Sequence, residues 1–270
     1  MILFLSLSVM LADASIRALE RATSITTTES LVAIFFLVSK PEHDNEMWDS
    51  TFLDDEGRDV FTYAAALSYD WKQRGVTAGI VGFTSANDGK ASWGDLQPVL
   101  HQYARLGGKD AERMLSLAET AHTSNADADA LCDSIKSLHG HERDMFEQSQ
   151  IDSLCAPGGY VHEAIDAIGD LDLPPHPLYV AIVFDTALNF GLGGEYCPKT
   201  WLAKNGTRGD AKKTFRAFLE WKASAGAKNN HNGCKHNAEQ RAKQFKKLLD
   251  KNHLTLPRRS CEEAVRWKMK

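Results

Sequence analysis

The chain has 270 residues, of which 43% are hydrophobic and 25% are charged, and its formal net charge at neutral pH is −5. This is ordinary globular composition, and we find no low-complexity linker or internal repeat. The negative balance argues against a general nucleic-acid binder, because neutralising phosphates requires a basic face. The length supports one large domain or two lobes around a shared cleft.

Residues 1–14 form an apolar run that is too short to span a bilayer and ends in the small-x-small pattern Ala12-Asp13-Ala14. The pattern predicts a secretory signal peptide that is cleaved near Ala14, and the alternative is a buried N-terminal helix. We therefore expect residues 15–270 to form a single extracellular domain without a membrane span.

Residues 26–39 predict a helix, and the continuous apolar run within it belongs in a core. Pro41 ends this helix, so that Glu42 lies just past a buried helix end. Desolvation at such a place raises the pKa of a carboxyl, as a general acid near neutral pH requires. The alternative is that Glu42 belongs to a solvated acidic loop together with Asp44, Glu46 and Asp49. Further along, the alanine-rich residues 60–69 also predict a helix.

Residues 74–83 combine Gly75, Gly79 and Gly82 with β-branched and aromatic side chains. A glycine removes the Cβ that would keep a ligand or a second strand at a distance, so we predict a glycine-rich strand open to close approach. Polar residues lie at both ends of this stretch, as on the floor of a cleft. An ordinary hairpin is the alternative.

Helical periodicity then predicts helices over residues 95–106, 111–121, 126–138, 141–154, 160–168, 212–225 and 238–249. The apolar run 178–190 is long for a strand and predicts a buried helix. Asp185 lies in its middle, and a buried carboxylate needs a cation or several donors from elsewhere in the chain. The basic helices near the C-terminus indicate a solvated face, because aromatic residues do not interleave with their basic ones.

The five cysteines lack the CxxC spacing of zinc and redox motifs. In a secreted protein they form up to two disulfides, and the pairs nearest in sequence are Cys132 with Cys155 and Cys197 with Cys234. Spacing alone leaves the connectivity open. The triplet that begins at Asn205 is a glycosylation sequon in a predicted polar loop, and it has meaning only if the chain is exported.

The residues 74–83, R-G-V-T-A-G-I-V-G-F, resemble the signature R-G-Y-T-A-G-x-x-G-F of the family 46 chitosanases. Further similarities follow in the same order along the chain, namely V-S-K-P-E at 38–42, F-E-Q-S-Q at 146–150, Phe184-Asp185 and E-Q-R at 239–241. The resemblance implies a mainly α (α+β), two-lobed lysozyme-like fold with a small β-sheet in the minor lobe and a cleft between the lobes. It also implies a secreted, endo-acting hydrolase that cleaves the β-1,4 links of chitosan with inversion.

The resemblance further implies roles for individual residues. Glu42 corresponds to the general acid, and Thr77 to a threonine that helps hold the attacking water. Asp95 falls on a carboxylate that binds a glucosamine ammonium, and Arg74 at the start of the signature is the second substrate-binding candidate.

A supporting charge network is also implied. Asp185 falls on a buried aspartate that joins two arginines behind the acid. In this chain the corresponding positions are Lys222 and Lys235, which keep the charge but lose the planar fork of a guanidinium.

The clearest departure from the family lies at Lys72, which stands where the family has its general-base aspartate. An inverting mechanism needs two carboxyls roughly 6.5–9.5 Å apart, one protonated and one ionised. We predict Asp70, two residues upstream, as the substitute base. The acidic segment before it offers further candidates, namely Asp54, Asp55, Glu56 and Asp59. No metal or other cofactor is expected, because two carboxyls supply both functions.

The sequence therefore predicts a secreted, monomeric glycosidase whose partner is chitosan or a related amino-sugar polysaccharide, with no nucleic-acid or membrane partner. Lys72 raises the alternative of a catalytically inactive relative that binds the polysaccharide without cutting it. A secreted structural or effector protein that retains only the fold is a third possibility.

Overall fold

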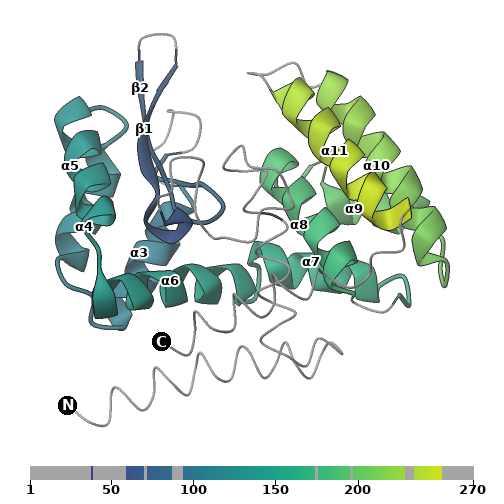
Figure 1. The fold of residues 1–270 in the computed structure, drawn as a ribbon, viewed down its shortest axis with the longest axis horizontal. Helices are drawn as coiled ribbons and strands as arrows, with labels where there is room; N and C mark the ends of the chain where they lie inside the picture. The colour runs from purple at the N-terminus through teal and green to yellow at the C-terminus, as the bar shows by residue number, and fades with distance from the viewer. Residues whose placement is uncertain are drawn as a thin grey trace. The chain divides into compact units, whose positions relative to one another are not determined.

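The computed structural model of the chain describes residues 38, 59–69, 72–86, 94–173, 176–194, 197–228 and 234–250. For residues 67–69, 72–74, 226–228 and 234–237 it describes the backbone alone. The described part is mainly helical and contains one small antiparallel sheet, as predicted (Figure 1). The chain divides into two compact units, with a boundary between Ala156 and Pro157.

The first unit contains a three-stranded sheet in which β2 (Lys72–Ala78) lies between β1 (Ala64–Tyr69) and β3 (Phe83–Thr84) and runs antiparallel to both. A single 3-10 turn, η1 (Val60–Thr62), precedes β1. The prediction of a helix over 60–69 is therefore wrong. Pairing with β2 satisfies the backbone of the alanine-rich segment, and this tertiary pairing overrides the high helix propensity of alanine.

The glycine-rich stretch is a strand followed by a tight turn, so the predicted strand covers only its first half. The ladder ends at Ala78, and the chain turns before it resumes pairing at Phe83. Gly79 has a φ of 79°, and its N–H donates to the carbonyl of Tyr63 at 2.8 Å. A Cβ at this position would lie 2.3 Å from Oε1 of Gln150. Both conformation and close approach thus require glycine at the turn.

Four helices complete the described part of the first unit, and all four were predicted. The predicted apolar face of the first of them, with Leu96, Val99, Leu100 and Tyr103, is fully buried. The helix that contains these residues, α3 (Leu96–Arg105), packs on α6 (Gly140–Cys155), and α5 (Asn125–Lys136) packs on β1 and β2 (Figure 1). In chain order they are α3 (Leu96–Arg105), α4 (Ala111–Thr120), α5 (Asn125–Lys136) and α6 (Gly140–Cys155).

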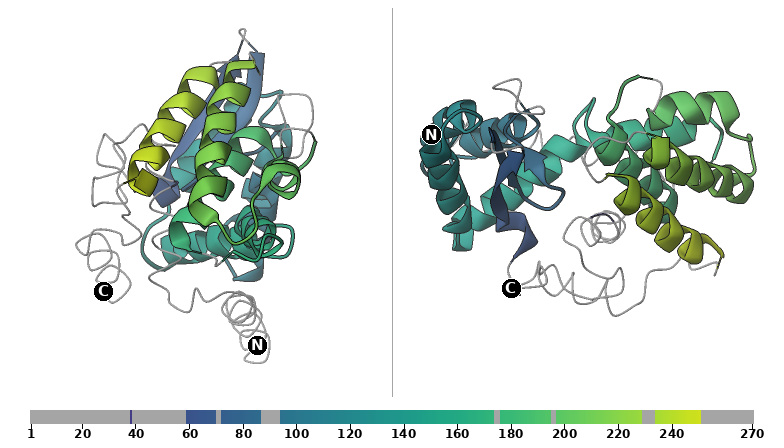
Figure 2. Two further views of the ribbon diagram at one scale, coloured as in Figure 1. Left: turned by 90° about the vertical axis from the view of Figure 1, so that its right-hand side faces the viewer. Right: turned by 90° about the horizontal axis from the view of Figure 1, so that it is seen from above.

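The second unit is entirely helical in its described part. Its apolar helix is buried from Leu178 to Ala187, as predicted. Its last two helices lie side by side, as both views in Figure 2 show. The elements are α7 (Tyr160–Gly169), α8 (Pro177–Phe190), α9 (Pro198–Asn205), α10 (Ala211–Lys228) and α11 (Cys234–Asp250).

Helix α9 was not predicted. Asn205 is its last residue rather than part of a loop, and the side-chain amide of Asn205 donates to the carbonyl of Trp201 at 3.0 Å. Pro198 in the first turn is the sequence signal for this helix, because proline is favoured at the first helical position.

The expected disulfides are absent among the described residues. Cys132, Cys155 and Cys197 are buried free thiols, so neither Cys132–Cys155 nor Cys197–Cys234 is formed. Burial raises the pKa of Cys132, and it raises the pKa of Cys155 to about 12, which disfavours the reactive thiolate. Proximity in sequence did not bring these sulfurs together, because each lies on a different helix or helix end.

No helix in the described part of the chain combines the length and the apolar character needed to cross a membrane. The predicted signal peptide lies outside the described residues. Of the predicted helix 26–39, only Val38 is described, and it is helical and fully buried.

Candidate functional site

Four of the predicted site residues lie wholly or partly outside the described structure. Glu42 and Asp70 are outside the described residues, and Asp70 belongs to the two-residue connection between β1 and β2. Arg74 and Lys235 are described for their backbone alone, in β2 and α11 respectively. Lys72, at the position of the family base, begins β2 opposite Tyr69.

In the structure Thr77 and Asp95 both neighbour Thr84 of the edge strand β3. Thr77 is half-buried on β2, and its direct partner across the ladder is Thr84 on β3. Asp95 occupies the N-cap position of α3 without a side-chain capping bond, and its Oδ1 accepts hydrogen bonds from the backbone N–H of Thr84 at 2.5 Å and from the Thr84 hydroxyl at 3.3 Å. Thr84 therefore connects the predicted water-binding threonine to the predicted ammonium-binding carboxylate.

A second set of contacts holds the start of α3 against the sheet. The side-chain amide of Gln97 donates to the carbonyl of Ser85 at 2.7 Å, and its Oε1 accepts from Gly94 N–H at 2.8 Å. A Cβ on Gly94 would lie 2.1 Å from the carbonyl oxygen of Thr84, so only glycine allows this approach. Backbone contacts thus fix where the Asp95 carboxylate lies.

Asp59, one of the candidate bases, has a structural role. Its Oδ1 accepts from the N–H of Phe61 at 3.0 Å and caps the 3-10 turn. Its Oδ2 pairs with Nε of Arg143 at 2.5 Å, and Arg143 also pairs with Glu147 at 2.7 Å. Both carboxylate oxygens of Asp59 are thus bound within the fold, which favours a structural role over a catalytic one. The remaining base candidates of the acidic segment lie outside the described residues, namely Asp54, Asp55 and Glu56.

The predicted buried carboxylate has the predicted kind of partner. Asp185 on α8 is fully buried, and its two oxygens bind different cations. Oδ2 pairs with the ammonium of Lys222 on α10, and Oδ1 accepts from Nη1 of Arg241 on α11 at 2.9 Å. The Lys222 ammonium also lies 5.9 Å from the ring centroid of Phe245. One carboxylate thus ties three helices of the second unit together.

Arg241 is the functional candidate that sequence reasoning missed. Its side chain is among the largest fully buried ones in the described part of the chain. The sequence contains a signal for Arg241, because E-Q-R at 239–241 is part of the resemblance. The position of the second network cation, however, was predicted at Lys235. The motif that contains Arg241 is therefore the better guide to this cation.

A second buried carboxylate, which was not predicted, lies on α6. Asp152 accepts hydrogen bonds from the side-chain amides of Gln148 at 2.8 Å and Gln102 at 3.0 Å. Burial raises the pKa of Asp152, although both amides oppose this by stabilising the ionised form. Among the described residues no basic side chain pairs with Asp152.

No protein-family model matches the chain, and no curated protein matches it.

Proposed function

We propose that the chain is a glycoside hydrolase that cleaves the β-1,4 links of chitosan by an inverting acid/base mechanism, within a two-lobed lysozyme-like fold. The observation that carries the proposal is the charge network of Asp185, Lys222 and Arg241. The resemblance to family 46 chitosanases implies a buried aspartate joined to two basic side chains. Asp185 is a buried aspartate with two basic partners, although the second is Arg241 and not the expected Lys235. Burying three charges is costly enough to need a reason.

In the proposed reaction Glu42 gives its proton to the glycosidic oxygen as the bond to the anomeric carbon breaks. A water on the opposite face of the ring attacks that carbon and gives its proton to the base, for which Asp70 is the candidate. Thr77 would orient this water through its hydroxyl. The products are two shorter chains, and one of them carries a new reducing end of inverted configuration.

Selection for a cationic sugar is assigned to Asp95. A carboxylate has about four acceptor positions, so contacts with Thr84 are compatible with a further bond from a glucosamine ammonium. The Thr84 contacts fix Asp95 in place before substrate arrives, and such preorganisation reduces the entropy lost on binding. Charge-assisted hydrogen bonds are roughly twice as strong as neutral ones, which favours glucosamine over its neutral acetylated form.

The test uses the purified mature protein and measures new reducing ends from chitosan. We expect activity in the unaltered protein and a loss of about 100-fold or more in kcat for Glu42→Gln, because general acid catalysis contributes that much. Glu46→Gln, in the same acidic segment, is the matched control and should retain activity. Equal rates for Glu42→Gln and the unaltered protein would contradict the assignment of the acid.

One sequence observation favours a second function. Lys72 occupies the position of the family base, and a lysine that is charged at neutral pH does not activate water. The second candidate is therefore a catalytically inactive protein that binds chitosan. Cosedimentation with insoluble chitosan, without release of reducing ends, would favour this function over hydrolysis.

A further inference from the structure

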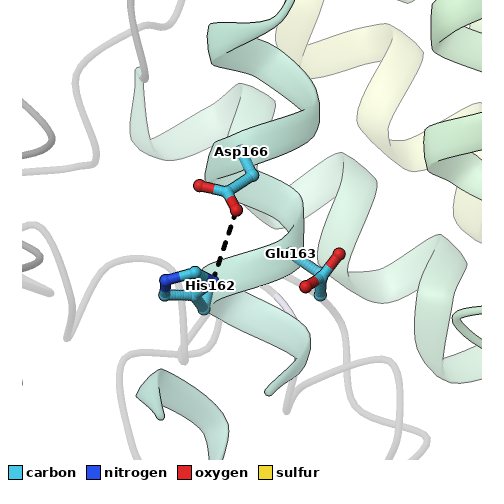
Figure 3. A group of neighbouring side chains, drawn as sticks. All are labelled: His162, Glu163 and Asp166. Atoms are coloured by element: carbon cyan, nitrogen blue, oxygen red, sulfur yellow. Dashed lines mark ion pairs between the residues drawn. The ribbon is translucent and has the colours of Figure 1, made fainter. Parts of the chain in front are cut away.

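Three potential metal ligands gather on α7 of the second unit, on residues that have no part in the proposed reaction. His162, Glu163 and Asp166 belong to adjacent turns of this helix, and one ligand atom of each lies within 4.8 Å of the others (Figure 3). Residues four apart on a helix lie one above the other, so His162 and Asp166 project from the same face. The sequence places a histidine and two carboxylates together without help from any other element.

The spacing of His162 and Asp166 suits a shared metal ion as well as the ion pair that the two side chains form when the histidine is protonated. Nδ1 of His162 is a buried atom without a hydrogen-bond partner in the described structure, and Oδ2 of Asp166 lies 3.5 Å from it. A hydrogen bond between nitrogen and oxygen normally spans about 2.7–3.2 Å. Two ligands at the usual zinc distances of about 2.0–2.1 Å, arranged tetrahedrally, are about 3.3 Å apart. The two atoms are therefore separated as the ligands of one ion are.

Glu163 has a competing partner. Its Oε2 pairs with the ammonium of Lys199 on α9 at 3.0 Å. The Lys199 ammonium therefore competes with a metal ion for this carboxylate. Both side chains of this ion pair are partly exposed, and exposed pairs contribute only about 0–1 kcal/mol. A divalent ion can therefore compete with Lys199 for Glu163.

We propose that α7 binds a divalent transition-metal ion of the zinc type, through Nδ1 of His162 and the carboxylate of Asp166, with Glu163 as the third ligand when it leaves Lys199. An imidazole with carboxylates suits zinc and its neighbours, whereas magnesium and calcium prefer oxygen ligands alone. The remaining coordination position is open to water or to a group from outside the chain. This site is independent of the glycosidase proposal, which requires no metal.

The first test titrates the full chain with Zn²⁺ by isothermal calorimetry. We expect His162→Ala and Asp166→Asn each to weaken Zn²⁺ binding at least tenfold. His139→Ala and Asp170→Asn are matched controls, a histidine and an aspartate outside the cluster, and should bind Zn²⁺ as the unaltered chain does. Lys199→Met should strengthen binding severalfold, because it releases Glu163. Unchanged affinity in both His162→Ala and Asp166→Asn would overturn the proposal.

The second test identifies the ligand atom by spectroscopy. Cu²⁺ binds the same donor types more tightly than Zn²⁺, and its paramagnetic spectrum resolves splitting from directly bound nitrogen. We expect the tightest Cu²⁺ site to show imidazole nitrogen that disappears in His162→Ala and persists in Glu163→Gln. A spectrum that is identical in the unaltered chain and His162→Ala would place the ion elsewhere and contradict the proposal.

Discussion

The buried polar side chains of the two units are satisfied in different ways. In the first unit, the amides of Gln97 and Gln150 bind backbone groups, and Asp152 accepts from amides. The ion pair of Glu147 with Arg143 in this unit leaves each side chain about a tenth exposed. In the second unit, Asp185 is bound by two cations, Lys222 and Arg241.

This difference predicts how strongly a single substitution destabilises each unit. A neutral amide can be replaced at the cost of the bonds it makes, whereas removing one member of a buried charge network leaves the others as uncompensated charges. We therefore expect the second unit to be far more sensitive to single substitutions and the first to show the more graded response.

Asp185→Asn should have the largest effect, because it leaves two buried cations without a carboxylate. We expect the free energy of unfolding to fall by about 4 kcal/mol, measured by chemical denaturation. Asp250→Asn is the matched control, since Asp250 pairs with Arg216 at 2.6 Å on the surface and its loss should cost less than about 1 kcal/mol. Similar losses for the two variants would contradict the contrast between the units.

Lys222→Met should cost somewhat less, about 3 kcal/mol, because Asp185 keeps its bond to Arg241. Lys222→Arg retains the charge and should recover part of this loss. If Lys222→Met proved as stable as the unaltered protein, the ammonium would not be needed to balance the buried carboxylate.

Gln150→Leu tests a neutral contact of the first unit. The Gln150 side chain accepts from Ile80 N–H at 2.9 Å and donates to the carbonyl of Phe61 at 2.8 Å. Leucine leaves both backbone groups buried without these bonds, so we expect a loss of about 2 kcal/mol, measured by chemical denaturation. Gln148→Leu, which removes one partly buried side-chain contact with Asp152, should cost less. Equal losses for the two variants would mean that the hydrogen bonds of Gln150 to the backbone stabilise the fold no more than the contact of Gln148 with Asp152.

Asp152→Asn should have the smallest effect at any one pH, within about 1 kcal/mol, but a distinctive pH dependence. Because burial raises its pKa, folded Asp152 holds its proton at pH values where the unfolded chain has released it. The protonated carboxyl therefore stabilises the fold at pH values below the pKa of Asp152 in the unfolded chain. This contribution declines as the pH rises through the pKa of Asp152 in the folded protein.

The free energy of unfolding of Asp152→Asn should accordingly increase relative to the unaltered protein between about pH 4 and pH 7. Denaturation curves at several pH values measure this difference. A constant difference across that range would mean that burial does not govern the Asp152 carboxyl.

The sequence predicted the helices well, because their apolar periodicity is a local property. The continuous apolar run around Asp185 predicted α8 and the need for a cation or several hydrogen-bond donors. The strand β1 was mispredicted because Ala64–Tyr69 becomes a strand only through its partner β2, and such pairing leaves no local mark in alanine-rich sequence.

The candidate site was predictable to a different extent in each unit. Thr77 and Asp95 each neighbour Thr84, an arrangement that depends on the turn between β2 and β3 and on Gly94. Arg241 was missed as the partner of Asp185, because which face of α11 meets α8 depends on helix packing rather than on spacing in sequence. The disulfides were mispredicted for a similar reason, since the distance between two cysteines in sequence does not fix the distance between their sulfurs.

The configuration of the first sugar product released from chitosan tests the central claim most directly. Proton magnetic resonance distinguishes the two anomers before they interconvert. An inverting hydrolase that acts on β-1,4 links must release the α-anomer first, and this is the result we predict. Release of the β-anomer would contradict the inverting mechanism, and binding without any product would contradict hydrolysis.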